Sequence, residues 1–165
     1  MKKIVFILIV LFIATSCSLK KKKQEVQEFH PKPFKLTVLV DNFMESKRKY
    51  ILTEKKIVII NISPISGILI PHEKGTAVKD DVDTLISKSI KPDKTLEQLS
   101  NINIDTLRDF YSNNNIMDGQ YITVELNKQG KVKEISLDNY YNKQIGIIIT
   151  QLNKFIPKEY KIIYN

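Results

Sequence analysis

The segment from residue 120 to residue 137, QYITVELNKQGKVKEISL, restricts the fold of this 165-residue chain more than any other. Apolar and polar side chains alternate on both sides of a polar centre, and a period of two is typical of strands with one buried face. Gly130 supplies the positive φ that a tight turn between antiparallel strands commonly requires. The segment therefore predicts a β-hairpin, with strands over residues 121–126 and 132–137.

Two further stretches predict strands of an antiparallel sheet. Residues 34–40, FKLTVLV, alternate in the same way, and residues 49–62, KYILTEKKIVIINI, form two apolar runs around a polar centre at 53–56. The second stretch is typical of another hairpin. Residues 63–76 hold two prolines and two glycines around an apolar run at 68–70, which indicates an irregular connection with one short buried strand.

Apolar residues spaced by three and four predict helices in the second half of the chain. Two short helices are expected after Asp93 and Asp105, because an aspartate side chain can accept hydrogen bonds from the first backbone N–H groups of a helix. A C-terminal amphipathic helix, which we expect to cover the sheet, runs to Pro157. Its apolar positions are Ile145, Ile148, Ile149, Leu152, Phe155 and Ile156.

Two segments are less regular. Residues 78–90, VKDDVDTLISKSI, predict a short helix or turn that leads into a strand before Pro92. Residues 159–164, EYKIIY, predict a last strand.

These elements predict an α+β fold with a mainly antiparallel sheet, built from hairpins and packed by the C-terminal amphipathic helix and the two short helices. Residues 34–165 are expected to form a single globular domain, since they are numerous enough to bury one core. The chain has one cysteine, so no disulfide can form within it, and the core alone must stabilise the domain.

The first sixteen residues have the layout of a secretory signal peptide. Lys2 and Lys3 precede eleven apolar residues at 4–14, a run too short to span a bilayer, which takes about 20 apolar residues in a helix. Cys17 follows this run, and ATSC at residues 14–17 resembles the lipobox of bacterial lipoproteins, with alanine where leucine is most usual. The alternative is an ordinary signal peptide followed by an incidental cysteine.

The lipobox resemblance implies that residues 1–16 are removed, that Cys17 becomes the N-terminus and that its thiol carries lipid. Two or three acyl chains would hold the protein stably on a membrane, because each buried CH₂ contributes about 0.8 kcal/mol. Residues 17–33 then form the lipidated cysteine and a basic flexible tether. Its sixteen residues after the cysteine would average about 22 Å end to end as a flexible coil.

The net charge of +8 is concentrated at the N-terminus. Removal of the signal peptide leaves +6, and lysines at residues 20–23 supply four of these charges, so that residues 24–165 carry +2. We therefore expect no nucleic-acid partner. The four lysines either gain about 1 kcal/mol each beside an anionic bilayer or serve as a solvated spacer.

Side chains that could bind a metal or carry catalysis are few. The two histidines are His30, in the tether, and His72, in a loop rich in proline, which argues against a zinc site. Asp80, Asp81 and Asp83 lack the glycine and glutamate spacing of an EF-hand and indicate a solvated helix start. No nucleophile elbow or phosphate-binding glycine pattern occurs. We assign no catalytic residue, no metal ligand and no cofactor, although paired carboxylates for glycoside hydrolysis stay open.

Aromatic residues gather around the predicted C-terminal helix, at Tyr140, Tyr141, Tyr160 and Tyr164. They are interpreted as packing residues, with a ligand platform as the alternative. The polar stretch SNNNIMDG at residues 112–119 indicates an exposed turn, or else a binding loop.

Residues 102–126, INIDTLRDFYSNNNIMDGQYITVEL, and 133–164, KEISLDNYYNKQIGIIITQLNKFIPKEYKIIY, together with the lipobox, resemble small uncharacterised envelope lipoproteins of Bacteroidota. The resemblance is best over about residues 100–165 and implies a cell-envelope location with no site residue beyond Cys17. In that group, surface-exported lipoproteins carry acidic residues after the cysteine. The lysines found here imply the periplasmic side of the outer membrane.

The leading hypothesis is a membrane-anchored lipoprotein whose domain is a non-enzymatic binding module for another envelope protein or component. One alternative is a lipid-anchored hydrolase that acts near the membrane. Another is an immunity-type inhibitor of a secreted toxin. The oligomeric state is left open.

Overall fold

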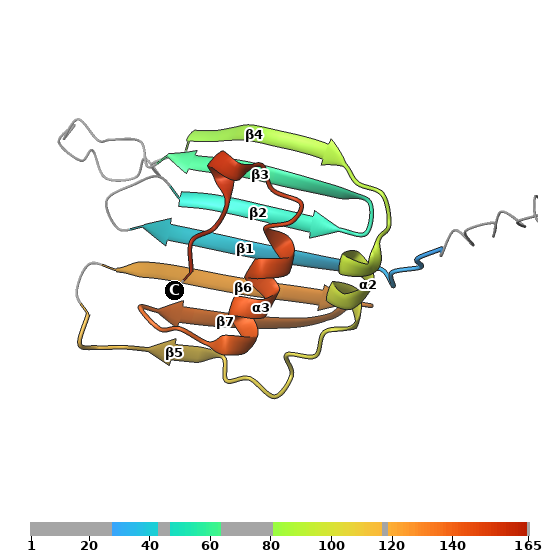
Figure 1. Cartoon of the computed structure of the whole chain (residues 1–165). Coiled ribbons are helices and arrows are strands. Elements are labelled where there is room, and N and C mark those ends of the chain that lie inside the picture. The colour runs from blue at the N-terminus through green and yellow to red at the C-terminus, as the bar shows by residue number, and fades with distance from the viewer. Residues whose placement is uncertain (1–27, 43–46, 64–80, 117–118, 165) are drawn as a thin grey trace, which may run out of the picture.

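The protein forms one seven-stranded sheet, in a computed structural model that describes residues 28–42, 47–63, 81–116 and 119–164. The strand order is β4-β3-β2-β1-β6-β7-β5 (Figure 1). All neighbours are antiparallel except β5 and β7, which are parallel. The strands are β1 Phe34–Asn42, β2 Lys47–Thr53, β3 Lys56–Ser63, β4 Asp81–Ser89, β5 Phe110–Ser112, β6 Gln120–Lys128 and β7 Lys131–Asp138.

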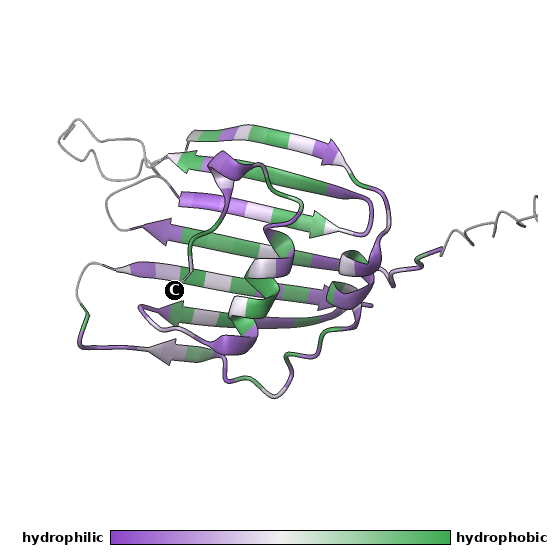
Figure 2. Ribbon diagram, viewed as in Figure 1, coloured by the Kyte–Doolittle hydropathy of each residue, from purple (hydrophilic) through white to green (hydrophobic). Residues whose placement is uncertain are grey.

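Helices cover one face of this sheet (Figure 1). They are α2 (Lys94–Asn101), α3 (Lys143–Leu152) and the short 3₁₀ helix η1 (Lys158–Tyr160). Alternate strand residues point toward them and are buried, and Figure 2 shows the apolar positions of the central strands beneath α3. The core includes Leu36, Val38, Leu52, Ile57, Ile59, Val124, Ile135, Ile145, Ile148 and Leu152. The α+β class and the mainly antiparallel sheet are therefore confirmed.

Both predicted hairpins are present. The β6–β7 turn consists of Gln129 and Gly130, with φ of 53° and 84°, and a two-residue turn with positive φ at both positions matches the twist of antiparallel strands. The β2–β3 turn is held by Thr53, whose Oγ1 accepts hydrogen bonds of 3.2 Å from the backbone N–H groups of Lys55 and Lys56.

One of the two predicted short helices is present. Asp93 caps α2, because its carboxylate accepts a 2.8 Å hydrogen bond from the Leu96 N–H. The helix predicted after Asp105 is wrong: residues 102–109 form turns, followed by β5. The Asp105 carboxylate accepts a hydrogen bond from Lys131 instead of capping a helix.

Besides the helix expected after Asp105, two other predictions differ from the structure. The strand expected before Pro92 is confirmed as β4, but Asp81 and Asp83, which were expected at a solvated helix start, already belong to this strand, and a bulge between Ile59 and Ile60 of β3 adjusts its register. The expected strand over 159–164 is wrong. The side chain of Asn153 binds both backbone groups of Ile162, donating to its carbonyl at 2.8 Å and accepting from its N–H at 2.9 Å. The N–H and carbonyl of Ile162 are therefore not available to pair with a neighbouring strand.

Helix α3 begins after Asn142, whose side chain accepts hydrogen bonds from the N–H groups of Gln144 and Ile145. It ends at Leu152, four residues before the predicted end, and Ile156 is buried beyond it. The short strand expected at residues 68–70 lies outside the described residues.

Candidate functional site

The sheet face opposite the helices, which we call the uncovered face, has none of the described helices over it (Figure 1). Its half formed by β1–β3 combines apolar side chains with lysines, among them Lys49, which lies opposite both Leu39 and Ile60. Ile51 and Val58 lie directly opposite each other, and Ile60 follows on the same side of β3. The partly exposed side chains Leu39, Ile51, Val58, Ile60 and Ile62 lie around Lys49 and form a group that we call the apolar patch.

The exposed edge of the patch extends onto β4. Val82 lies opposite Ile62 and is 59% exposed. Monomeric soluble proteins rarely leave large contiguous apolar surface in water, so such a surface is a candidate binding site.

The other half of the uncovered face, on β6 and β7, is polar and acidic. Glu125 and Glu134 lie directly opposite each other in the ladder. Like charges in this position destabilise a sheet. Thr37 separates this pair from the patch, since it lies opposite both Ile51 and Glu125. The uncovered face thus combines a group of apolar side chains around Lys49 with an acidic half.

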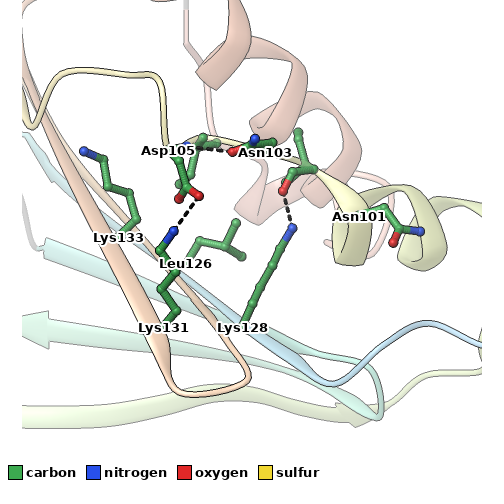
Figure 3. A pocket seen from close by; sticks show the side chains of 9 residues that line it. Asn101, Asn103, Asp105, Leu126, Lys128, Lys131 and Lys133 are labelled. Atoms are coloured by element: carbon green, nitrogen blue, oxygen red, sulfur yellow. Dashed lines mark hydrogen bonds and ion pairs between the residues drawn. The ribbon is translucent and has the colours of Figure 1, made fainter.

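A second candidate is a cavity of about 180 Å³ between the end of α2 and the β6–β7 turn (Figure 3). Three lysines of the hairpin line it. Lys128 donates a hydrogen bond to the Ile102 carbonyl, and Lys131 lies 2.7 Å from a carboxylate oxygen of Asp105. Lys133 forms an ion pair with Asp109 at the rim. All three ammonium groups therefore already have partners.

Burial and hydrogen bonding each shift the pKa of one ionisable group in this cavity. Partial burial lowers the pKa of Lys128, since desolvation disfavours its charged form. The hydrogen bond from Lys131 lowers the pKa of the Asp105 carboxyl. Both partners in that ion pair are largely exposed, so the pair contributes little to stability.

The predicted tyrosine cluster is largely a packing arrangement. Tyr141 and Tyr164 have ring centroids 5.0 Å apart, and Tyr111 stacks on Tyr140 at 5.2 Å. The Tyr164 hydroxyl accepts a 2.7 Å hydrogen bond from the Asn142 N–H and donates to the Tyr140 carbonyl. Burial raises the pKa of Tyr164.

Three of these tyrosines, Tyr140, Tyr141 and Tyr164, also line a cavity of about 230 Å³ beside the start of β6. Tyr160 is elsewhere: its carbonyl accepts a hydrogen bond from Tyr50, and Arg48 lies 6.0 Å from its ring centroid. The ligand-platform alternative stays a prediction.

The other residues singled out from the sequence do not converge on these cavities. Cys17 and His72 lie outside the described residues, as does Asp80. His30 lies 3.6 Å from Glu28, and both side chains are 80% exposed. In the described ranges no group of three His, Cys, Asp or Glu side chains could hold a metal ion. No helix among those residues is long and apolar enough to cross a membrane.

Sequence reasoning missed the apolar patch and the lysine-lined cavity. The run IVII at residues 57–60 was a signal for the patch, because apolar residues on both faces of a strand imply that neither face favours water. No comparable signal identified the cavity, whose walls come from segments about 25 residues apart.

Comparison of the chain with family models, with curated proteins and with solved structures finds no match.

Proposed function

We propose that this protein is a lipid-anchored envelope protein whose domain binds another envelope protein through the uncovered face. Removal of residues 1–16 would leave Cys17 as the lipidated N-terminus, on the periplasmic side of the outer membrane. The layout of the first 33 residues supports the anchor. The domain needs no catalytic group for this role.

The apolar patch is the observation that carries the binding role. Its five side chains are partly exposed on three adjacent strands, so a partner surface can remove their remaining exposed area from water together. Burial of such surface contributes about 25 cal/mol per Å². Because Glu125 and Glu134 adjoin the patch across Thr37, we expect the partner to present basic side chains on that side of its apolar ones, away from Lys49.

The helical face has a different role in this proposal. Ile145, Ile148, Ile149 and Leu152 are buried on α3, which serves as the amphipathic C-terminal helix that closes the core. One face of the sheet then stabilises the fold, and the other is available for binding.

Two valines on the uncovered face allow a matched test of the patch. Val58→Thr places a hydroxyl within it, while Val132→Thr makes the same change on β7, outside it, where the side chain is 54% exposed. Partners crosslinked in intact cells would be identified by mass spectrometry, purified and titrated against the protein. We expect Val58→Thr to weaken binding about fivefold or more and Val132→Thr to leave it unchanged. Equal affinity for both variants would refute the patch as the site, and self-association or lipid binding through it would identify a different occupant.

The anchor has its own test. Cys17→Ser should release the protein from the membrane fraction and leave the precursor uncleaved, since the thiol that receives the lipid is lost. Unchanged membrane retention would refute lipid attachment. The hydrolase and immunity-type alternatives stay predictions from the sequence.

A further inference from the structure

The chain enters β1 at one end of the sheet, which we call the tether end. Four segments meet there with α2 (Figure 1), and they are residues 30–33, 54–56, 90–94 and 128–131. The ladder places Phe34 opposite Lys128, and the Ile90 N–H donates a 2.9 Å hydrogen bond to the Lys55 carbonyl. Strands distant in the sequence therefore bring their ends to one surface.

This surface is strongly basic. The four segments contain seven lysines and two carboxylates, Glu54 and Asp93. Asp93 already accepts a hydrogen bond from the first turn of α2, and Asp105 beside the segments offsets the charge of Lys131. With Glu97 of α2 and Asp105 counted as well, the seven lysines outnumber four carboxylates, and the surface keeps a net positive charge.

At the opposite end of the strands, acidic side chains outnumber basic ones. Among its described residues, Asp41, Asp83 and Asp138 outnumber Lys47 and Arg48. Lys47 is held 2.7 Å from Asp41. Among the described residues, charge is therefore separated along the strand direction, with the positive end where the chain enters.

The sequence before the tether end adds charge of the same sign. Lysines at residues 20–23 lie ten to thirteen residues before Pro33, and chain of this length reaches at most about 36 to 47 Å when fully extended. Attachment to a membrane at Cys17 would thus bring these lysines and the tether end within reach of the lipid.

We propose that the tether end is a docking surface for an anionic lipid bilayer. This inference rests on the proposed lipid anchor, which supplies the proximity that the charges need, because electrostatic attraction fades within a Debye length of about 8 Å at physiological salt. Docking would direct the strands away from the bilayer. The uncovered face would then be perpendicular to the membrane plane and accessible to a partner.

Orientation can be measured by energy transfer to the membrane. Cys17 is the only cysteine and its thiol is occupied in the lipidated protein, so an introduced cysteine takes a donor dye uniquely. Gln98→Cys places the dye on the exposed side of α2 at the tether end, and Asn115→Cys places it before β6 at the opposite end. The lipidated protein is reconstituted into vesicles of phosphatidylethanolamine and phosphatidylglycerol that carry acceptor dye on the headgroups.

We expect more transfer from position 98 than from position 115 at low salt. The difference should disappear at about 1 M salt, where the Debye length is about 3 Å, and in vesicles without phosphatidylglycerol. Equal transfer from the two positions at low salt would overturn docking.

Charge variants identify the surface. The test variant neutralises exposed lysines of the tether end by Lys55→Gln, Lys91→Gln and Lys94→Gln. The control removes equal charge from exposed positions near α3 and η1 by Lys143→Gln, Lys158→Gln and Lys161→Gln. Each tether-end lysine removed should lower the ratio of docked to undocked protein about fivefold at low salt, and the control should keep the difference in transfer.

An unchanged difference in the test variant would overturn the inference while leaving the anchor intact. Failure of the anchor is a separate result: the protein would not float with the vesicles at either salt concentration. That outcome would overturn both proposals.

Discussion

Replacement of Thr37 by valine tests the energetics of the uncovered face. Thr37 lies in the central strand β1, between Ile51 and Glu125, and only 8% of it is exposed. Its Oγ1 is buried and has no hydrogen-bond partner in the described part of the chain. A hydroxyl that loses water without gaining a partner destabilises the folded state.

The size of the effect follows from what valine changes. Thr37→Val keeps the branched shape that suits a strand and removes the unpaired hydroxyl, whose desolvation costs about 1–3 kcal/mol. Some of this is recovered by local adjustment, so we expect a gain of about 1 kcal/mol in the free energy of unfolding. For a domain of this size, that gain raises the melting temperature by about 4 °C.

Urea unfolding of the purified protein, followed by circular dichroism, measures this change. Thr123→Val is the matched control, because Thr123 lies on the same face of the adjacent strand β6 and is more exposed. We expect it to alter the free energy of unfolding by less than about 0.5 kcal/mol. If Thr37→Val leaves stability unchanged or lowers it, the hydroxyl is satisfied in solution and the reasoning fails.

Three further changes test local features of the structure. Gly146→Ala should displace the Tyr141 ring, whose hydroxyl lies 2.7 Å from the position of the new Cβ, and NMR would show the loss of its ring contacts. The free energy of unfolding should change by less than about 1 kcal/mol, because alanine is more favourable than glycine in a helix by about 1 kcal/mol, which offsets the cost of moving the ring. Asn153→Ala removes two hydrogen bonds to the C-terminal segment and should lower the free energy of unfolding by about 1–3 kcal/mol in urea, whereas an unchanged midpoint would contradict this. The pKa of Asp105 is lowered by Lys131, so Lys131→Gln should bring it back toward 3.8 in an NMR titration. In the unmodified protein, the small contribution of this pair to stability should be present above pH 3.8. It should be lost as the pH falls through the lowered pKa of Asp105.

Local patterns predicted those elements whose stabilising contacts are themselves local. Gly130 lies within the turn that it permits, and Asp93 is three residues from the N–H that it binds. In both cases the interaction partner falls within the window in which the pattern was recognised. The strand at residues 34–40 was confirmed for the same reason, since alternation reports burial of one face whatever covers it.

The errors arose where a distant partner competed for a local group. Asp105 has the sequence context of a helix cap, but Lys131, which is 26 residues away, takes its carboxylate. Residues 159–164 have the alternation of a strand, yet Asn153 binds the backbone at Ile162. Such competition depends on the packed structure, and a single sequence contains no sign of it.

The two candidate surfaces were hidden for a related reason. The apolar run at residues 57–60 shows that both faces of β3 are apolar, but not which face the helices leave uncovered. The basic tether end is assembled from four turns and strand ends that are separated along the chain. Neither surface exists until the strand order is known.

The two proposed surfaces depend on each other through the geometry of the sheet. Strand β1 has nine residues and so extends about 30 Å, whereas the tether alone would average about 22 Å. Without docking, the domain could turn about its tether and present the uncovered face in any direction, including toward the bilayer. With the tether end on the lipid, the strands point outward and the apolar patch faces along the membrane. The lysine variant of the tether end should therefore reduce partner capture in cells, although it leaves every residue of the patch unchanged.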